Sequence, residues 1–127
     1  MTKRKLPNIL LIEDNGMFLT MQTNILDGYK VYTAMTGDEG IKLFKNKKPD
    51  IVFLDIGLPD MSGHAVLNAI KKIDKDAYIV MITASRLKND IEEALNEGAK
   101  GYVMKPFSSK RIEECITKYY QYIESHV

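Results

Sequence analysis

The segment Asn8-Ile9-Leu10-Leu11-Ile12-Glu13-Asp14 joins an unbroken apolar run to two carboxylates. Four apolar residues in a row, without the alternation of a half-exposed strand, are typical of a strand buried on both faces of a parallel sheet. The ligand site of such a sheet lies outside the carboxyl ends of its strands. We therefore expect Glu13 and Asp14 to face a ligand.

Two later segments repeat this pattern and end in charged residues of complementary kinds. Residues 51–54 are apolar and lead to Asp55, and residues 101–104 lead to Lys105. Because the carboxyl ends of parallel strands meet at one edge of the sheet, the acidic side chains and the lysine should share one crevice. Mg²⁺ is typically held by one or two carboxylates together with phosphate oxygens and water. The sequence thus predicts a site for a metal ion and a phosphoryl group.

Strand-like and helix-like segments alternate five times along the chain. Such alternation is typical of a parallel sheet with right-handed crossovers and helices on both faces. For five strands the common doubly wound order is 2-1-3-4-5, with the switch point between strands 1 and 3, which here end in carboxylates. We therefore expect an α/β fold with a five-stranded parallel sheet and five helices. The expected strands cover residues 8–12, 29–35, 51–54, 77–82 and 101–104, and the expected helices begin near residues 17, 36, 65, 90 and 109.

Short signals mark where helices begin or end and which face of the last helix is buried. Thr36 precedes Glu39 by three residues, the pattern of a capping box, and Gly98 is a candidate C-cap for the fourth helix. Tyr120 and Tyr122 are expected to point outward, and one interpretation makes them a surface for a partner or a dimer. The buried stripe of the last helix is expected to hold Ile112, Cys115, Ile116, Tyr119 and Ile123.

The length of the chain and its small net charge favour a single domain without a strongly charged surface. The 127 residues fit one domain, with a core over about residues 7–124 and a basic tail at residues 1–6. A formal net charge of +1 creates no strong field, so we expect direct binding neither to nucleic acid nor to membrane. The single cysteine suits a reducing compartment, and no apolar run approaches the roughly 18 residues of a membrane span. These observations predict a cytoplasmic location.

The predicted crevice holds the groups that phosphoryl transfer needs. Asp14 and Asp55 can bind an ion directly, and Glu13 can do so through water. A carboxylate such as Asp55 is also a nucleophile toward phosphorus, while Lys105 and the Thr83 hydroxyl can stabilise phosphoryl oxygens. Taken singly, each residue has a structural explanation: a helix cap for the acidic pair, a turn for Asp55, solvation for the lysine and strand propensity for the threonine. Their coincidence at equivalent strand ends favours function.

The segment from Asp55 to Gly63 resembles the phosphoacceptor loop of receiver domains from response regulators of two-component signalling. Glu13-Asp14, Thr83-Ala84 and Lys105-Pro106-Phe107 match the family's other motifs, in order and at its spacing. The resemblance covers about residues 7–124. It implies a flavodoxin-like fold. It also implies a signalling domain that is not an enzyme in the ordinary sense, although it catalyses its own phosphorylation and dephosphorylation.

The resemblance implies a role for each matching residue of the acidic site. Asp55 would take a phosphoryl group from the phosphohistidine of a sensor histidine kinase, or from a phosphotransfer protein. Mg²⁺, with Mn²⁺ as an alternative ion, would be bound by Asp14, Asp55 and the backbone carbonyl of Gly57. Glu13 would act on the ion through water.

Other matching positions bear on switching and on phosphoryl lifetime. Thr83 and Tyr102 match the switch pair: the hydroxyl closes onto the phosphoryl group, the ring turns inward, and the surface of the fourth helix, fifth strand and fifth helix changes for a partner. The bond before Pro106 matches one that is usually cis in the family. Gly57 and Ser85 stand where the family sets how fast the phosphoryl group is lost. Both are small, so they neither position a water nor block one.

Other classes of protein fit this sequence less well. A haloacid-dehalogenase-like phosphatase needs a second carboxylate where Gly57 stands, and a flavodoxin needs a hydroxyl- and glycine-rich loop after the first strand. The G-x-G-x-x-G of dinucleotide-binding domains is absent. A phosphotransfer domain needs a histidine on a helical bundle, whereas we expect His64 and His126 to be solvated. A receiver-fold scaffold that binds partners without phosphorylation is the remaining alternative.

The expected downstream partner follows from the end of the chain. Few residues follow the last predicted helix, and none form a DNA-binding motif. The output is therefore either a separate protein target of a stand-alone regulator or an output domain that has been removed from a longer one. A dimer that forms on phosphorylation is a further alternative.

Overall fold

The computed structural model describes residues 6–84, 88–105 and 108–126, and within them strands and helices alternate as predicted. The strand β2 is shorter than its predicted range because the Tyr29 N–H still donates to Leu26 O in the preceding turn, at 3.0 Å. The elements are β1 Ile9–Ile12, α1 Gly16–Ile25, β2 Val31–Ala34, α2 Gly37–Lys47, β3 Ile51–Asp55, α3 Gly63–Ile73, β4 Tyr78–Thr83, α4 Lys88–Asn96, β5 Gly101–Met104 and α5 Ser109–Ser125.

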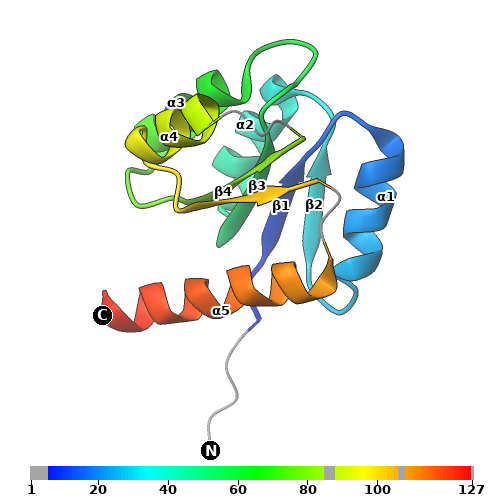
Figure 1. Cartoon of the computed structure of the whole chain (residues 1–127), viewed down its shortest axis with the longest axis vertical. Helices are drawn as coiled ribbons and strands as arrows, with labels where there is room; N and C mark the ends of the chain where they lie inside the picture. The colour runs from blue at the N-terminus through cyan, green and yellow to red at the C-terminus, as the bar shows by residue number, and fades with distance from the viewer. Residues whose placement is uncertain (1–5, 85–87, 106–107, 127) are drawn as a thin grey trace, which may run out of the picture.

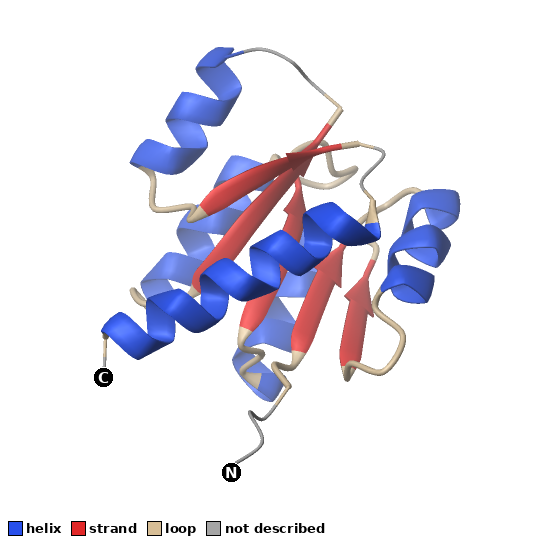
Figure 2. Ribbon diagram, turned by 60° about the horizontal axis from the view of Figure 1, so that its bottom comes forward, coloured by secondary structure: helices blue, strands red, loops and turns tan. Residues whose placement is uncertain are grey.

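The five strands form one parallel sheet in the order β2-β1-β3-β4-β5, which confirms the predicted topology (Figure 2). The strand β1 pairs with β2 on one side and with β3 on the other, so the winding reverses between β1 and β3. The register sets Ile12 opposite Leu54 and Asp55 opposite Ile82. The residues that follow β1 therefore emerge beside the end of β3, at the switch point of the sheet.

Each face of the sheet packs against its own set of helices. Leu10 of β1 belongs to a core with Phe44 of α2 and Leu67 of α3. Its neighbour Ile9 belongs to the opposite core, which includes Ile112 of α5. Side chains of a strand alternate between faces, so an unbroken apolar run supplies both cores at once. Helices on both faces of the sheet are visible in Figure 1.

Side-chain caps set the starts of the helices next to the sheet. The Thr36 hydroxyl accepts from Glu39 N at 3.1 Å, as the capping-box pattern predicts. The Asn15 side chain caps α1 by accepting from Phe18 N at 3.1 Å, so the alternative in which the acidic pair before it caps this helix is wrong. After α4, Gly98 has φ +108° and provides the left-handed turn that ends the helix, as predicted.

The last turns of α5 differ from the predicted stripe. Ile123 was expected to be buried but is 37% exposed, and Tyr120 and Tyr122 were expected to point outward but are half-buried against the core. The reason is Tyr78 at the start of β4, whose ring lies 5.2 Å from the rings of both Tyr119 and Tyr122. These aromatic contacts turn Tyr122 toward the sheet and leave Ile123 outside. The other predicted members of the stripe are buried: Ile112, Cys115 and Ile116.

The helices are short relative to a bilayer. The longest, α5, has 17 residues and carries charged side chains along its length. Within the described ranges, none of the helices combines the length and the apolar character that crossing a membrane requires.

Candidate functional site

Three carboxylates meet at the carboxyl ends of β1 and β3. Glu13 and Asp14 follow β1, and Asp55 is the last residue of β3. One carboxylate oxygen from each of the three lies within 4.8 Å of the other two. Glu13 and Asp55 are buried, whereas Asp14 is exposed. The fold thus brings together the acidic residues that the sequence predicted to share one crevice.

Lys105 reaches this cluster from the end of β5. Its Nζ lies 2.6 Å from Glu13 Oε1 and 3.1 Å from Asp55 Oδ2, and its side chain is 9% exposed. The ring of Phe18 on α1 lies under the ammonium, with the centroid 4.7 Å from Nζ. The lysine thus joins the ends of three strands through two charge-assisted hydrogen bonds in a nearly dry site.

The electrostatics of this cluster separate the two buried carboxyls. Burial, and then the neighbouring Glu13, raise the pKa of Asp55 from 3.8 to about 6. Burial alone would raise the pKa of Glu13, but hydrogen bonding with Lys105, with the Asp55 carboxyl and with the Asn15 N–H outweighs it, so that pKa is lowered. Burial lowers the pKa of Lys105, but bonding to the two carboxyls outweighs it and the pKa is raised. At neutral pH all three groups are charged, with the ammonium between the carboxylates.

The loop after Asp55 is held by contacts that the sequence did not predict. Gly63 N donates to Ile56 O at 2.7 Å, and a Cβ on Gly63 would lie 2.6 Å from Asp55 O, so only glycine lets α3 start this close to β3. Asp60 accepts from Gly37 N at 2.8 Å and from the next backbone N–H at 3.0 Å. These bonds hold the pKa of Asp60 below its ordinary value and fasten the loop to the start of α2. The role of Asp60 was not predicted from the sequence, because its partners belong to a helix far away in the chain.

The remaining predicted site residues lie at nearby strand ends or outside the described residues. Thr83 is the last residue of β4 and is buried. Tyr102 in β5 is 37% exposed. A Cβ on Gly57 would meet none of the described residues within 4 Å, so among them that position has room for a side chain. Ser85 and Pro106 lie outside the described residues.

A buried glutamine also belongs to the site. Gln22 of α1 is 2% exposed and donates through Nε2 to Glu13 Oε1, at 3.4 Å. Its Oε1 is buried, and no hydrogen-bond partner for it exists among the described residues. Sequence analysis missed this residue, although one signal was available. Gln22 stands four residues after Phe18 and three before Ile25, and is thus a polar residue on the apolar stripe of its helix.

The two histidines have different surroundings. His126 is exposed, as predicted, and its Nδ1 lies 2.7 Å from Tyr122 O. The prediction that His64 is solvated is wrong: its side chain is 16% exposed, with Nδ1 3.4 Å from Glu97 and Nε2 4.0 Å from Glu93. The reason is that Glu93 and Glu97, at the end of α4 and just after it, lie against His64 at the start of α3, which the sequence pattern of either helix alone does not reveal.

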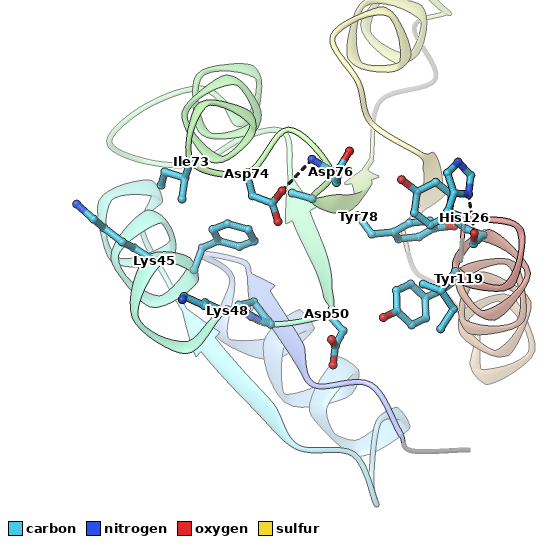
Figure 3. A pocket seen from close by; sticks show the side chains of 14 residues that line it. Lys45, Lys48, Asp50, Ile73, Asp74, Asp76, Tyr78, Tyr119 and His126 are labelled. Atoms are coloured by element: carbon cyan, nitrogen blue, oxygen red, sulfur yellow. Dashed lines mark hydrogen bonds between the residues drawn. The ribbon is translucent and has the colours of Figure 1, made fainter. Parts of the chain in front are cut away.

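A cavity of about 730 Å³ lies at the opposite, amino-terminal edge of the sheet (Figure 3). Tyr119 and Tyr78 form one side of it, and Lys45 and Lys48 of the α2 end form another. Burial, with the nearby charge of Asp50, raises the pKa of Tyr119 to about 12. None of the predicted site residues lines this cavity.

The acidic cluster has the donor set of a hard divalent cation. Mg²⁺ binds oxygen ligands, retains several waters and needs one or two carboxylates. Asp14 is exposed and offers an accessible oxygen, while Asp55 and Glu13 are fixed by burial and by Lys105. The residues present therefore fit Mg²⁺. With a lysine beside them, they also fit an incoming phosphoryl group.

Comparison with known sequences gives one consistent family. The model of the response regulator receiver domain matches residues 9–117. The chain is 34% identical to the chemotaxis protein CheY of Bacillus subtilis over 113 residues, which are 87% of this chain and 94% of that protein. It is 34% identical over 123 residues to the probable C4-dicarboxylate response regulator DctR of the same organism. That match covers 94% of this chain and 54% of DctR, so the chain spans about half the length of this relative.

Solved structures agree with these sequence matches. A CheY-like receiver domain protein from Methanospirillum hungatei superposes with a TM-score of 0.89 at 29% identity, over 97% of this chain and 100% of that chain. The CheX-CheY-BeF3-Mg complex from Borrelia burgdorferi contains a chain that superposes with a TM-score of 0.84 at 30% identity, over 89% of this chain and 88% of that one. Both similarities extend over nearly the whole sheet and its helices.

Proposed function

The chain belongs to the response regulator receiver domain family, and we propose that Asp55 is its phosphoacceptor. One observation carries this proposal. Lys105 Nζ contacts the carboxylates of Glu13 and Asp55 at 2.6 and 3.1 Å, so the ends of β1, β3 and β5 form one charged site. We propose that residues 1–127 form a single receiver domain, a cytoplasmic signalling module rather than an enzyme in the ordinary sense.

The donor for Asp55 is the phosphohistidine of a sensor histidine kinase or of a phosphotransfer protein. A carboxylate oxygen of Asp55 forms a bond to phosphorus while the P–N bond of the donor breaks. The electron pair of that bond leaves with the imidazole, which takes up a proton. Since the pKa of Asp55 is about 6, the carboxylate is largely ionised at neutral pH and ready to attack. Lys105 then turns from Asp55 to the phosphoryl oxygens, whose negative charge it stabilises.

The metal site uses the same carboxylates. Asp14, Asp55 and the backbone carbonyl of Gly57 would hold Mg²⁺, or Mn²⁺ in its place, and Glu13 would contact it through water. The ion, when bound, neutralises charge on the phosphoryl oxygens. The Borrelia CheY structure that contains BeF3 and Mg supports this proposal, because its chain superposes on this one over most of the sheet.

The switch couples this site to the surface of α4, β5 and α5. Thr83 ends β4 beside the β3 carboxylate, and its hydroxyl would close onto the phosphoryl group. The ring of Tyr102, a residue that is now 37% exposed, would turn inward into the space that the threonine leaves. The exposure of this residue in the unphosphorylated protein supports this direction of movement. Partners would read the altered surface.

The downstream partner of this domain is a protein. DctR is about twice as long as the matched region, which supports an output domain beyond a receiver domain, whereas CheY is matched over nearly its full length, which supports a separate target. We do not expect this domain itself to bind nucleic acid, because its formal net charge is only +1. Phosphorylation-dependent dimerisation is a third form of output.

The test uses acetyl phosphate with Mg²⁺ and intact-mass spectrometry. The wild-type chain should gain the mass of one phosphoryl group, and Asp55→Asn should gain none. Asp60→Asn is the matched control, since Asp60 lies on the same loop but binds α2, and it should still be phosphorylated. Equal uptake by wild type and Asp55→Asn would show that Asp55 is not the acceptor. No uptake by either protein, with Mg²⁺ binding intact, would favour a scaffold that is not phosphorylated.

A further inference from the structure

A second group of metal-binding side chains lies outside the phosphoryl site, where α3 meets α4. His64 is the second residue of α3, and Glu93 and Glu97 stand one turn apart on and just after α4. One ligand atom from each of the three lies within 4.8 Å of the other two. The group shares no residue with the acidic cluster at the ends of β1 and β3.

The spacing of two of these ligands matches a shared ion. His64 Nδ1 lies 3.4 Å from Glu97 Oε2. Zinc bonds of about 2.0–2.2 Å in a tetrahedral arrangement place neighbouring ligand atoms roughly 3.3–3.5 Å apart. Glu93 Oε2 lies 4.0 Å from the other ring nitrogen, and this side chain is 58% exposed. An oxygen of Glu93 nevertheless lies within 4.8 Å of a ligand atom of each of the other two residues, which places it in reach of a shared ion.

The backbone holds the two better-buried ligands in place. His64 follows Gly63, whose close approach to the end of β3 fixes the start of α3. Glu97 precedes Gly98, where the left-handed turn is closed by a 2.9 Å bond from Ala99 N to Ala94 O. The side chains of His64 and Glu97 are 16% and 25% exposed. Little conformational freedom is lost when an ion binds to side chains that are held in this way.

The charge around these ligands is unbalanced without a cation. Glu93 and Glu97 stand four residues apart, where like charges repel, and they lie at the carboxyl end of a helix, where the dipole disfavours anions. The last turn of α4 contains no basic residue. Lys71 lies near Gly98, but its ammonium donates to the carbonyls of Lys75 and Ala77, at 3.2 and 2.9 Å. One imidazole cannot balance two carboxylates, whether or not it carries a second proton.

We propose that His64, Glu97 and Glu93 bind a divalent ion of the zinc class. An imidazole nitrogen favours Zn²⁺, Co²⁺, Ni²⁺ or Cu²⁺ over Mg²⁺, whereas the acidic cluster offers only oxygen and suits Mg²⁺. Three protein ligands leave one tetrahedral position for water. Because the ligands come from both α3 and α4, the bound ion ties these two helices together. The proposal does not depend on phosphorylation at Asp55.

The test is calorimetric titration with Zn²⁺ in saturating Mg²⁺, which fills the oxygen site first. Wild type should bind one Zn²⁺ per chain. His64→Ala and Glu97→Gln should each weaken Zn²⁺ binding at least about tenfold, because even outer contacts of metal ligands contribute that much. Amide exchange in α4 should slow on addition of Zn²⁺ to wild type and not to these variants. Circular dichroism confirms that each variant is folded.

Two controls separate this site from general surface binding. His126→Ala removes the other histidine, which is exposed, and Glu92→Gln changes the neighbouring acid on α4. Both variants should bind Zn²⁺ as wild type does. The proposal is wrong if wild type binds no stoichiometric Zn²⁺, if His126→Ala removes the binding, or if His64→Ala and Glu97→Gln bind normally. Titration of His64 with protons alone, seen by NMR without any response to Zn²⁺, would identify a simple ion pair and also overturn it.

Discussion

Lys105 Nζ lies 2.6 Å from Glu13 Oε1, closer than the 3.1 Å that separates it from Asp55 Oδ2. Lys105 is thus paired chiefly with Glu13, which follows β1, and more weakly with Asp55. This arrangement keeps the ammonium beside the proposed nucleophile without neutralising it fully. When a phosphoryl group arrives, the lysine needs to give up only the longer of its two contacts.

Removing this ammonium should destabilise the metal-free protein. Lys105→Met leaves the buried Glu13 carboxylate without a cation, and breaking a buried ion pair costs about 3 kcal/mol or more. We expect the free energy of unfolding to fall by about 3 kcal/mol in urea titrations with EDTA at pH 8. Lys105→Arg keeps the charge and is the control. Equal stability of Lys105→Met and wild type would mean that the pair contributes nothing.

The raised pKa of Asp55 predicts how stability changes with pH. In the folded metal-free protein this pKa is about 6, against 3.8 ordinarily, so the folded state binds more protons between these values. The stabilisation is complete below pH 3.8 and is lost as pH rises through about 6. Asp55→Asn, which cannot ionise, should therefore be more stable than wild type at pH 8 by on the order of 2 kcal/mol.

This difference should be much smaller near pH 4, where Asp55 is protonated in the folded state and about half protonated in the unfolded state. Urea denaturation at pH 4 and pH 8 in EDTA measures it. A gain from Asp55→Asn that is the same at both pH values would contradict the raised pKa.

The two acids after β1 should differ in their effect on Mg²⁺ binding. Asp14→Asn removes a charged oxygen that we propose contacts the ion directly, and it should weaken Mg²⁺ binding by about a hundredfold or more. Glu13→Gln keeps the shape of a side chain that acts through water, so a loss of about tenfold is expected. Fluorescence or calorimetric titration with Mg²⁺ compares them. If neither substitution changes the affinity, the ion binds elsewhere.

Phosphoryl lifetime should depend on Gly57 and Ser85, the two small residues at the positions that set it in the family. No described residue lies within 4 Å of the place where a Cβ on Gly57 would stand, so Gly57→Asn is compatible with the described structure. The double variant Gly57→Asn and Ser85→Glu adds an amide and a carboxylate that can orient a water for hydrolysis. We expect it to release phosphate faster than wild type, in assays started from the phosphorylated protein. Faster release by wild type would reject this explanation.

The coupling between Thr83 and Tyr102 can be measured by NMR. Moving a two-state population from 1:99 to 99:1 takes about 5.5 kcal/mol of differential binding. Two charge-assisted contacts to the phosphoryl group, from Thr83 and Lys105, supply about 1.5–3 kcal/mol each. Thr83→Ala should therefore still accept phosphate, while the resonances of Tyr102 move much less than in wild type. Thr83→Ser keeps the hydroxyl and should respond normally. Equal shifts in the alanine variant would disprove the coupling.

Sequence alone was sufficient for the sheet and for the grouping of the strand-end residues. Unbroken apolar runs such as residues 9–12 and 51–54 specify strands that need cover on both faces, and strict alternation with helices leaves few topologies. Once the strands are parallel, their carboxyl ends share one edge. Glu13, Asp55 and Lys105 therefore had to meet, whatever the details of packing.

Tertiary structure alone decided the contacts that cross between elements. Three contacts depend on how two distant elements are turned toward one another: Gln22 with Glu13, Asp60 with the start of α2, and His64 with Glu93 and Glu97. The same holds for Tyr122, which turns inward because Tyr78 lies beneath it. The periodicity of apolar residues in a helix or strand predicts which of its faces is buried. It does not predict which residue of another element packs against that face. That residue is determined by the packing of the whole domain, because close-packed side chains constrain one another.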